Sequence, residues 1–140
     1  MSLDKILFTH TSIPLLSKAL DAYALRHKVI ANNIANITTP GYRRGEVEFE
    51  EELREALDGR AIKGRTSHPR HIPIGARSLD DVQPKVIVPD DPSMASGLNN
   101  VSIEQEMAEA AKNQLRYQLA AQGIAGMFRA LKLSITGRPA

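Results

Sequence analysis

Mostly apolar residues recur at alternating spacings of three and four along the first part of the chain. This recurrence runs through Ile13, Leu16, Leu20, Tyr23, His27, Ile30, Ile34 and Ile37. Such spacing is typical of a coiled-coil seam. Pro14 suits the first turn of a helix and Ser12 can cap it, while Pro40-Gly41 fits the centre of a type II turn. We therefore predict a helix over residues 13–37.

The same alternation returns towards the C-terminus of the chain. It runs through Ile103, Met107, Ala110, Gln114, Tyr117, Ala121, Ile124, Phe128, Leu131 and Ile135. Ser102 and Gln105 have capping-box spacing, and Gly137 is a suitable stop. Gly123 and Gly126 lie inside this pattern, where close approach of a neighbouring backbone can compensate for the cost of glycine. We predict a second long helix that ends near residue 135.

The segment between the two predicted helices has only short stretches of regular apolar spacing and is rich in proline. Residues 46–58 are amphipathic and stop at Gly59, which predicts a short helix, and residues 86–88 read as a short edge strand. The rest of residues 59–98 is a Pro-rich irregular loop. We expect an all-α fold in which long N- and C-terminal helices pair as a coiled-coil-like core. Its parts are an N-terminal helical segment 1–42, a middle excursion 43–98 with an irregular loop 59–98, and a C-terminal helical segment 99–140.

Composition narrows the function classes. Aromatic residues make up 4% of the chain and Trp is absent, so the apolar stripes of the two predicted long helices must provide most of the buried surface. Net charge is +2 with both signs mixed and no basic run interleaved with aromatics, so we expect no nucleic-acid partner. Without Cys there is no disulfide or thiol nucleophile. We expect neither a Sec-type signal peptide nor a membrane span.

Candidate catalytic and metal-binding residues are few. His68 and His71 flank Pro69, away from any helix face, and no third ligand stands near them. The paired acids at 80–81 and 90–91 lie in the Pro-rich loop without an apolar pocket that would raise a pKa, so they are solvated turn residues. We predict no catalytic site, no metal and no cofactor.

Polar residues interrupt the two stripes. His27 in the first and Gln114 in the second are expected to fix register or partner number, as polar groups in such seams do. Asn32, Asn33 and Asn36 crowd the end of the first helix, where their amides can bond unpaired carbonyls. Three amides exceed what one cap needs, so we expect the surplus to contact neighbouring chains.

These motifs resemble a known family. The run Ala31-Asn32-Asn33-Ile34-Ala35-Asn36 followed by Thr38-Thr39-Pro40-Gly41-Tyr42 is similar to the N-terminal signature of the bacterial flagellar basal-body rod proteins. Further similarity to the short proximal members of that family, over nearly the whole chain, comes from residues 68–71, 99–101, 104–107 and 113–118.

The resemblance implies a structural component of the proximal rod, linking the membrane ring and export gate to the distal rod within the periplasm. The implied partners are other rod proteins, the rod-to-membrane-ring adaptor, the flagellar type III export apparatus and copies of the chain itself. Export would occur without a cleaved signal peptide, and the termini would order on joining the rod. The expected assembly residues are Ile13, Leu16, Leu20, Tyr23, His27, Ile30, Asn32, Asn33, Ile34, Asn36, Pro40, Gly41, Tyr42, Met107, Gln114, Tyr117, Ile124, Phe128 and Leu131.

Two alternatives belong to other classes. One is a free-standing coiled-coil adaptor or export chaperone, which when purified would be strongly helical with a defined stoichiometry. The other is a small metallohydrolase centred on His68 and His71, which would bind metal firmly. A rod subunit would instead be poorly ordered alone, so circular dichroism with sedimentation separates these hypotheses.

Overall fold

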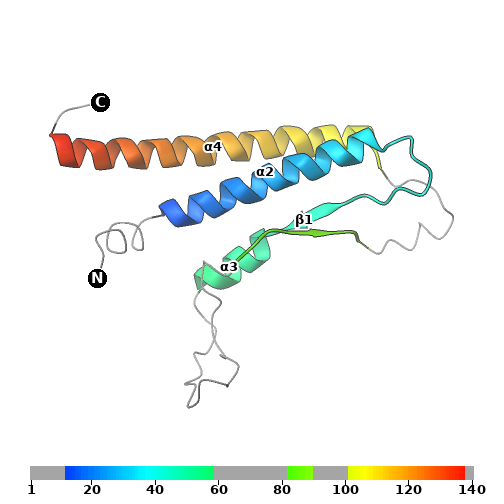
Figure 1. Cartoon of the computed structure of the whole chain (residues 1–140), viewed down its shortest axis with the longest axis horizontal. Coiled ribbons are helices and arrows are strands. Elements are labelled where there is room, and N and C mark those ends of the chain that lie inside the picture. Colours follow the sequence, from blue (N-terminus) through cyan, green and yellow to red (C-terminus); the bar gives the residue numbers. More distant parts are fainter. Residues whose placement is uncertain (1–11, 59–81, 90–100, 138–140) are drawn as a thin grey trace, which may run out of the picture.

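The structure is a computed structural model that describes residues 12–58, 82–89 and 101–137. The described part is mostly helical, with two long helices packed together and a small pair of strands (Figure 1). The predicted fold class is therefore confirmed. In chain order the elements are α2 (Ile13–Ala35), β1 (Glu46–Glu48), α3 (Glu50–Asp58), β2 (Lys85–Ile87) and α4 (Ile103–Thr136).

The two long helices run antiparallel. Near the start of α2, the position that a Cβ of Gly123 would occupy lies 3.3 Å from Leu16 Cδ1. Near the end of α2, the Asn33 side chain reaches Glu106 in the first turn of α4. The group that approaches Gly123 is thus the Leu16 side chain and not the neighbouring backbone that we predicted, and a Cβ at Gly126 would meet nothing within 4 Å. The C-terminal turns of α4 extend past the first residue of α2 (Figure 1).

The ends of α2 follow local sequence signals with one exception. The Ser12 side chain makes no capping hydrogen bond, so the cap predicted there is wrong. Pro14 lies in the first turn as expected, and the helix ends at Ala35, slightly before the predicted residue 37. Tyr42 N–H donates to the Thr39 carbonyl at 3.2 Å and Gly41 has a φ of 72°. The type II turn at Pro40-Gly41 is confirmed.

Both predicted ends of α4 are confirmed. The Ser102 side chain accepts a hydrogen bond from the backbone N–H of Gln105 at 3.4 Å. At the other end Gly137 adopts the left-handed conformation with a φ of 64°, and its N–H donates to the Leu133 carbonyl. A glycine at this position closes the helix without steric cost.

The short helix predicted over 46–58 begins later than expected. Residues 46–48 form strand β1, which pairs antiparallel with β2 in the register Glu46 with Ile87, Val47 with Val86 and Glu48 with Lys85. Exposed Glu46 and Glu48 alternate with buried Val47 and Phe49, a period of two that suits a strand. The strand predicted at 86–88 exists one residue earlier, at 85–87.

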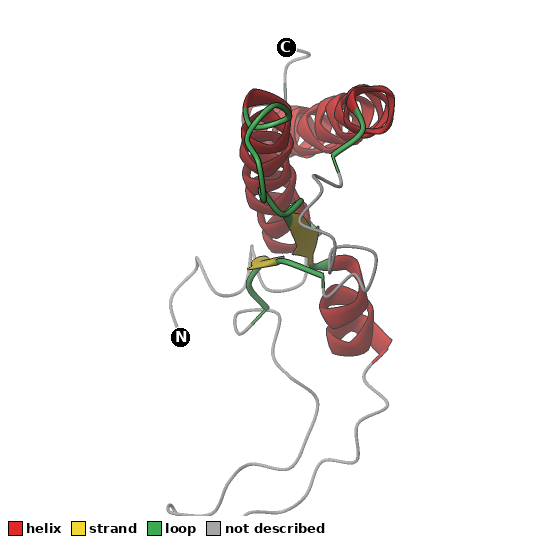
Figure 2. Cartoon of the chain, turned by 90° about the vertical axis from the view of Figure 1, so that its right-hand side faces the viewer, coloured by secondary structure: helices red, strands yellow, loops and turns green. Residues whose placement is uncertain are grey.

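The apolar core lies on the side of α2 that faces β1 and α3. Ala19 and Ala22 of α2 pack with Phe49 and Val82, and Tyr23, Leu53 and Ala56 border them. Small alanines let the Phe49 ring approach the helix, and Phe49 is only 2% exposed. Viewed from the side, the strands lie between the helix pair and α3 (Figure 2). The residues 68–71, 80–81 and 90–91 considered above lie outside the described part of the chain.

Candidate assembly interface

Asn33, from the Asn-rich motif, is the centre of a buried polar network. It is 1% exposed. Its Nδ2 donates to the Gly45 carbonyl at 2.9 Å and to Glu106 Oε2 at 3.0 Å, while its Oδ1 accepts from Gly45 N–H at 3.0 Å. Tyr42 Oη also donates to this Oδ1, at 3.1 Å. One amide therefore joins the end of α2, the chain entering β1, and the start of α4.

The buried carboxylate of Glu106 completes this network. It is fully buried and forms an ion pair with the Arg44 Nε, and Arg44 also pairs with Glu46. Burial opposes the charge of Arg44, but the hydrogen bonds and charges of Glu106 and Glu46 outweigh it and raise the pKa of Arg44 above its ordinary value. Arg44 therefore stays charged and bonded to Glu106, which fixes α4 against the Asn-rich turn.

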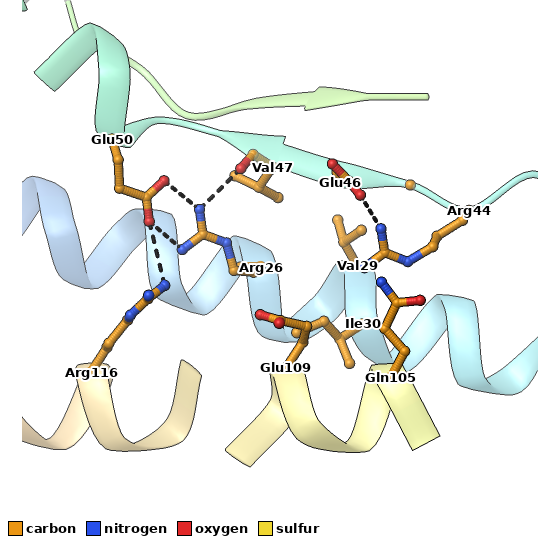
Figure 3. A pocket seen from close by; sticks show the side chains of 11 residues that line it. Arg26, Val29, Ile30, Arg44, Glu46, Val47, Glu50, Gln105, Glu109 and Arg116 are labelled. Atoms are coloured by element: carbon orange, nitrogen blue, oxygen red, sulfur yellow. Dashed lines mark hydrogen bonds and ion pairs between the residues drawn. The ribbon is translucent and has the colours of Figure 1, made fainter. Parts of the chain in front are cut away.

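A second charged cluster lines a cleft of about 400 Å³ between α2, β1 and α4 (Figure 3). The Arg26 guanidinium donates to both carboxylate oxygens of Glu50 at 2.6 Å and to the Val47 carbonyl at 3.0 Å. Arg116 of α4 lies 3.8 Å from the same carboxylate. Because Arg26 of α2 and Arg116 of α4 share the carboxylate of Glu50, this cluster is a clamp that holds β1 and α3 on the helix pair.

The ion pair between Arg26 and Glu50 predicts that the stability of the fold depends on pH. Partial burial of Glu50 opposes its charge, but the hydrogen bond and charge of Arg26 prevail and lower the pKa of Glu50 from its ordinary value. The ionised Glu50 carboxylate therefore stabilises the fold at pH values above its ordinary pKa. This stabilisation is lost as the pH falls through the lowered pKa of the folded state. We expect Glu50→Gln to cost about 1 kcal/mol at pH 7 and much less at pH 3. Urea unfolding at both values measures this; an equal cost at both would contradict it.

The predicted stripe on α4 is displaced from the face that packs on α2. The buried residues of α4 are Glu106, Asn113 and Ala120, which recur every seven positions. Each precedes a stripe residue by one, so the interior polar residue is Asn113 instead of Gln114. Periodicity located a helix face but missed Glu106 and Asn113, because a search for apolar repeats passes over polar residues. Their seven-residue spacing from Ala120 is the signal that was present.

The predicted assembly residues occupy three environments. Ile13, Ile30 and Asn33 are buried within the chain, and a larger group is half-buried. Half-buried are Leu16, Leu20, Tyr23, Ile34, Asn36, Tyr42, Ile124 and Leu131; exposed are His27, Asn32, Pro40, Gly41, Met107, Gln114, Tyr117 and Phe128.

The three asparagines divide their roles. Asn36 Nδ2 donates to the Asn32 carbonyl at 2.8 Å, which is the local bonding expected at a helix end. The Asn33 amide is used inside the chain, so it is not part of the surplus expected to contact neighbours. The Asn32 side chain is exposed and makes no hydrogen bond to the described residues. Contact of Asn32 with a neighbouring chain stays a prediction.

Two other kinds of feature are absent from the described residues: a cluster of metal ligands and a membrane-spanning helix. They contain no group of three or more His, Asp or Glu residues able to hold a metal ion. None of the described helices combines the length and apolar character that crossing a membrane requires.

Comparison with known proteins places the Asn-rich helix and turn in a family. Residues 15–43 match the family model described as flagella basal body rod protein. The chain is 37% identical over 123 residues to the flagellar basal body rod protein FlgB of Bacillus subtilis, covering 87% of this chain and 91% of the relative. Identity to FlgB of Salmonella typhimurium is 38%, covering 73% and 76%. For FlgB of Escherichia coli it is 30%, covering 81% and 85%. The chain therefore belongs to the FlgB family of flagellar basal body rod proteins.

Proposed function

We propose that the chain is a structural subunit of the proximal rod, with no enzymatic activity, that assembles through its terminal helices. It acts in the basal body, within the periplasm, between the membrane ring with its export gate and the distal rod. Its neighbours are other rod proteins, the rod-to-membrane-ring adaptor and further copies of the chain. It reaches them through the type III export apparatus. Family membership and an open apolar face on α4 support this proposal.

The open face is the observation that carries the proposal. Ile103, Met107, Tyr117 and Phe128 of α4 are 45%, 58%, 40% and 49% exposed, respectively. These residues follow the predicted seam, on a helix that packs against α2 with the adjacent face. Contiguous exposed apolar residues of this kind mark protein interaction sites. In the division of labour that we propose, segments 1–42 and 99–140 form the contacts between subunits, and the 43–98 excursion braces them.

We expect Met107→Asp with Phe128→Asp to prevent incorporation into basal bodies without disrupting the lone chain. The new carboxylates are solvated in the free chain but are buried in a contact on assembly, which costs several kcal/mol. Isolated basal bodies, probed by immunoblot, and swimming in soft agar measure the effect. Leu57→Asp is the matched control, since Leu57 is 52% exposed on α3, outside the terminal helices. Normal incorporation of the double variant would contradict the proposal.

The adaptor or chaperone alternative makes a different prediction for the purified wild type. It requires a strongly helical protein of fixed stoichiometry in solution. A rod subunit orders its termini on joining the rod, because long helices gain most of their stability from packing. Circular dichroism with sedimentation distinguishes the two, and a stable, strongly helical oligomer of the purified chain would favour the adaptor.

A further inference from the structure

A groove of about 270 Å³ opens between α2 and α4. None of its lining residues belongs to the charged cleft of Figure 3. His27 and Gln114, the polar residues that interrupt the two predicted stripes, both line it. The full lining is Tyr23, Ala24, His27, Asn113, Gln114 and Tyr117.

The groove contains a buried acceptor without a donor. Asn113 is 2% exposed, and its Nδ2 donates to the Tyr23 carbonyl at 2.9 Å. Its Oδ1 is buried and has no hydrogen-bond partner among the described residues. A buried acceptor without a hydrogen bond is unfavourable, so a donor supplied from outside would be favoured here.

The chemistry of the lining favours a cationic donor. The carboxamide of Gln114 is exposed and adds a second amide oxygen at the groove. The Tyr117 ring presents an electron-rich face, which attracts ammonium and guanidinium groups. Lysine and arginine are absent from the lining. An incoming ammonium would therefore meet amide oxygens on a wall that carries neither lysine nor arginine.

A suitable ammonium stands on the projecting end of α4. Lys132 is exposed, and its Nζ makes no hydrogen bond or ion pair with the described residues. It lies on the same face of the helix as Phe128 and Ile135, which precede and follow it by one turn. These two side chains are 49% and 75% exposed. The end of α4 thus presents a lysine flanked by two exposed apolar side chains.

The acceptor and the donor cannot meet within one chain. Asn113 and Lys132 stand on one continuous helix, which separates them by roughly 28 Å at about 1.5 Å per residue. We propose that the C-terminal turns of α4 from a second copy of this chain dock in the groove. Lys132 of that copy donates to Asn113 Oδ1, and its Phe128 and Ile135 cover the apolar groups around Tyr117.

This contact joins two different surfaces of the same chain. It is therefore head-to-tail, and repetition of such a contact builds a helical array instead of a closed dimer. The inference rests on the proposed rod function, because it describes how neighbouring copies contact each other in the rod.

Photo-crosslinking in assembled basal bodies tests the contact. The full chain, carrying p-benzoylphenylalanine at position 114, replaces the wild type in cells, and basal bodies are isolated after irradiation. We expect mass spectrometry to map the cross-link to residues 128–136 of a second copy. The same probe at position 57 is the control and should not reach that segment. Absence of both the wild-type chain and the position-57 variant from basal bodies would overturn the rod function; a position-114 chain that is incorporated but cross-linked elsewhere would overturn this inference alone.

A charge exchange identifies the lysine. Gln114→Lys and Lys132→Glu should each lower incorporation about tenfold, because each places like charges or removes the donor at the contact, and together they should restore it to within about twofold. Arg129→Glu is the matched partner control. The Arg129 Nε bonds the Ala125 carbonyl of its own helix at 3.4 Å, so Arg129→Glu should not rescue Gln114→Lys. Failure of the Lys132 pair to recover, or equal recovery with Arg129, would refute the assignment.

Discussion

Replacing Glu106 by Ala is expected to destabilise the folded chain by about 3–5 kcal/mol, because it removes the fully buried partner of both Arg44 and Asn33. The Glu106 carboxylate accepts from both Arg44 and Asn33 at a fully buried position. Its loss leaves Arg44, whose side chain is 14% exposed, with the exposed Glu46 in place of a buried counter-charge. The total free energy of unfolding of a typical domain is only about 5–15 kcal/mol, so the variant should also fail to enter basal bodies.

Urea unfolding measures the effect in trimethylamine N-oxide, which favours the compact state of a chain that is weakly ordered alone. Glu104→Ala is the matched control, since Glu104 is exposed two positions earlier in the same helix turn and should change the midpoint little. Glu106→Gln keeps an acceptor oxygen but loses the charge, so we expect its loss of stability to lie between those of the other two variants. A Glu106→Ala midpoint within error of the Glu104→Ala midpoint would show that the network does not stabilise the fold.

Ile30→Asp is expected to block rod assembly through the fold of the subunit. Ile30 is 5% exposed on α2 and borders the charged cleft beside Arg26 and Arg44 (Figure 3). The neighbouring arginines are already paired with Glu50 and Glu106. An aspartate at position 30 must therefore either bury an unpaired carboxylate or expose this face of the helix, at a cost of several kcal/mol. Ile124→Asp, on the half-buried face of α4, should act in the same direction with a smaller effect.

Export should remain largely intact in these variants, because the proposed route carries the unfolded chain. Immunoblots of the secreted fraction, compared with isolated basal bodies, separate export from assembly. Ala31→Asp is the control: it introduces the same carboxylate at an exposed position of α2 next to Ile30, outside the expected assembly residues. If Ile30→Asp assembled normally, the burial of this face in the rod subunit would be wrong.

Local signals accounted for most of the elements. The type II turn needs only Pro40 and a glycine that accepts positive φ, and both are adjacent in sequence. The ends of α4 likewise depend on Ser102 and Gly137 and their immediate neighbours. The expected helix over 46–48 failed because pairing with residues 85–87 decides that segment, and this pairing spans a long loop. A strand of three residues has too little local preference to reveal itself.

The sequence by itself determined that two long amphipathic helices flank an irregular excursion, since helix periodicity, caps and the Pro-Gly turn act between residues a few positions apart. Only the tertiary structure decided which face of α4 packs on α2. Glu106, Asn113 and Ala120, each one position before a residue of the apolar stripe, are the buried residues of α4, and the stripe itself is half-buried or exposed. It also joined Asn33 to Glu106, residues 73 positions apart whose mutual hydrogen bond exists only once both helices are packed. Apolar periodicity reports that a face will be buried, but not whether the covering surface belongs to the same chain.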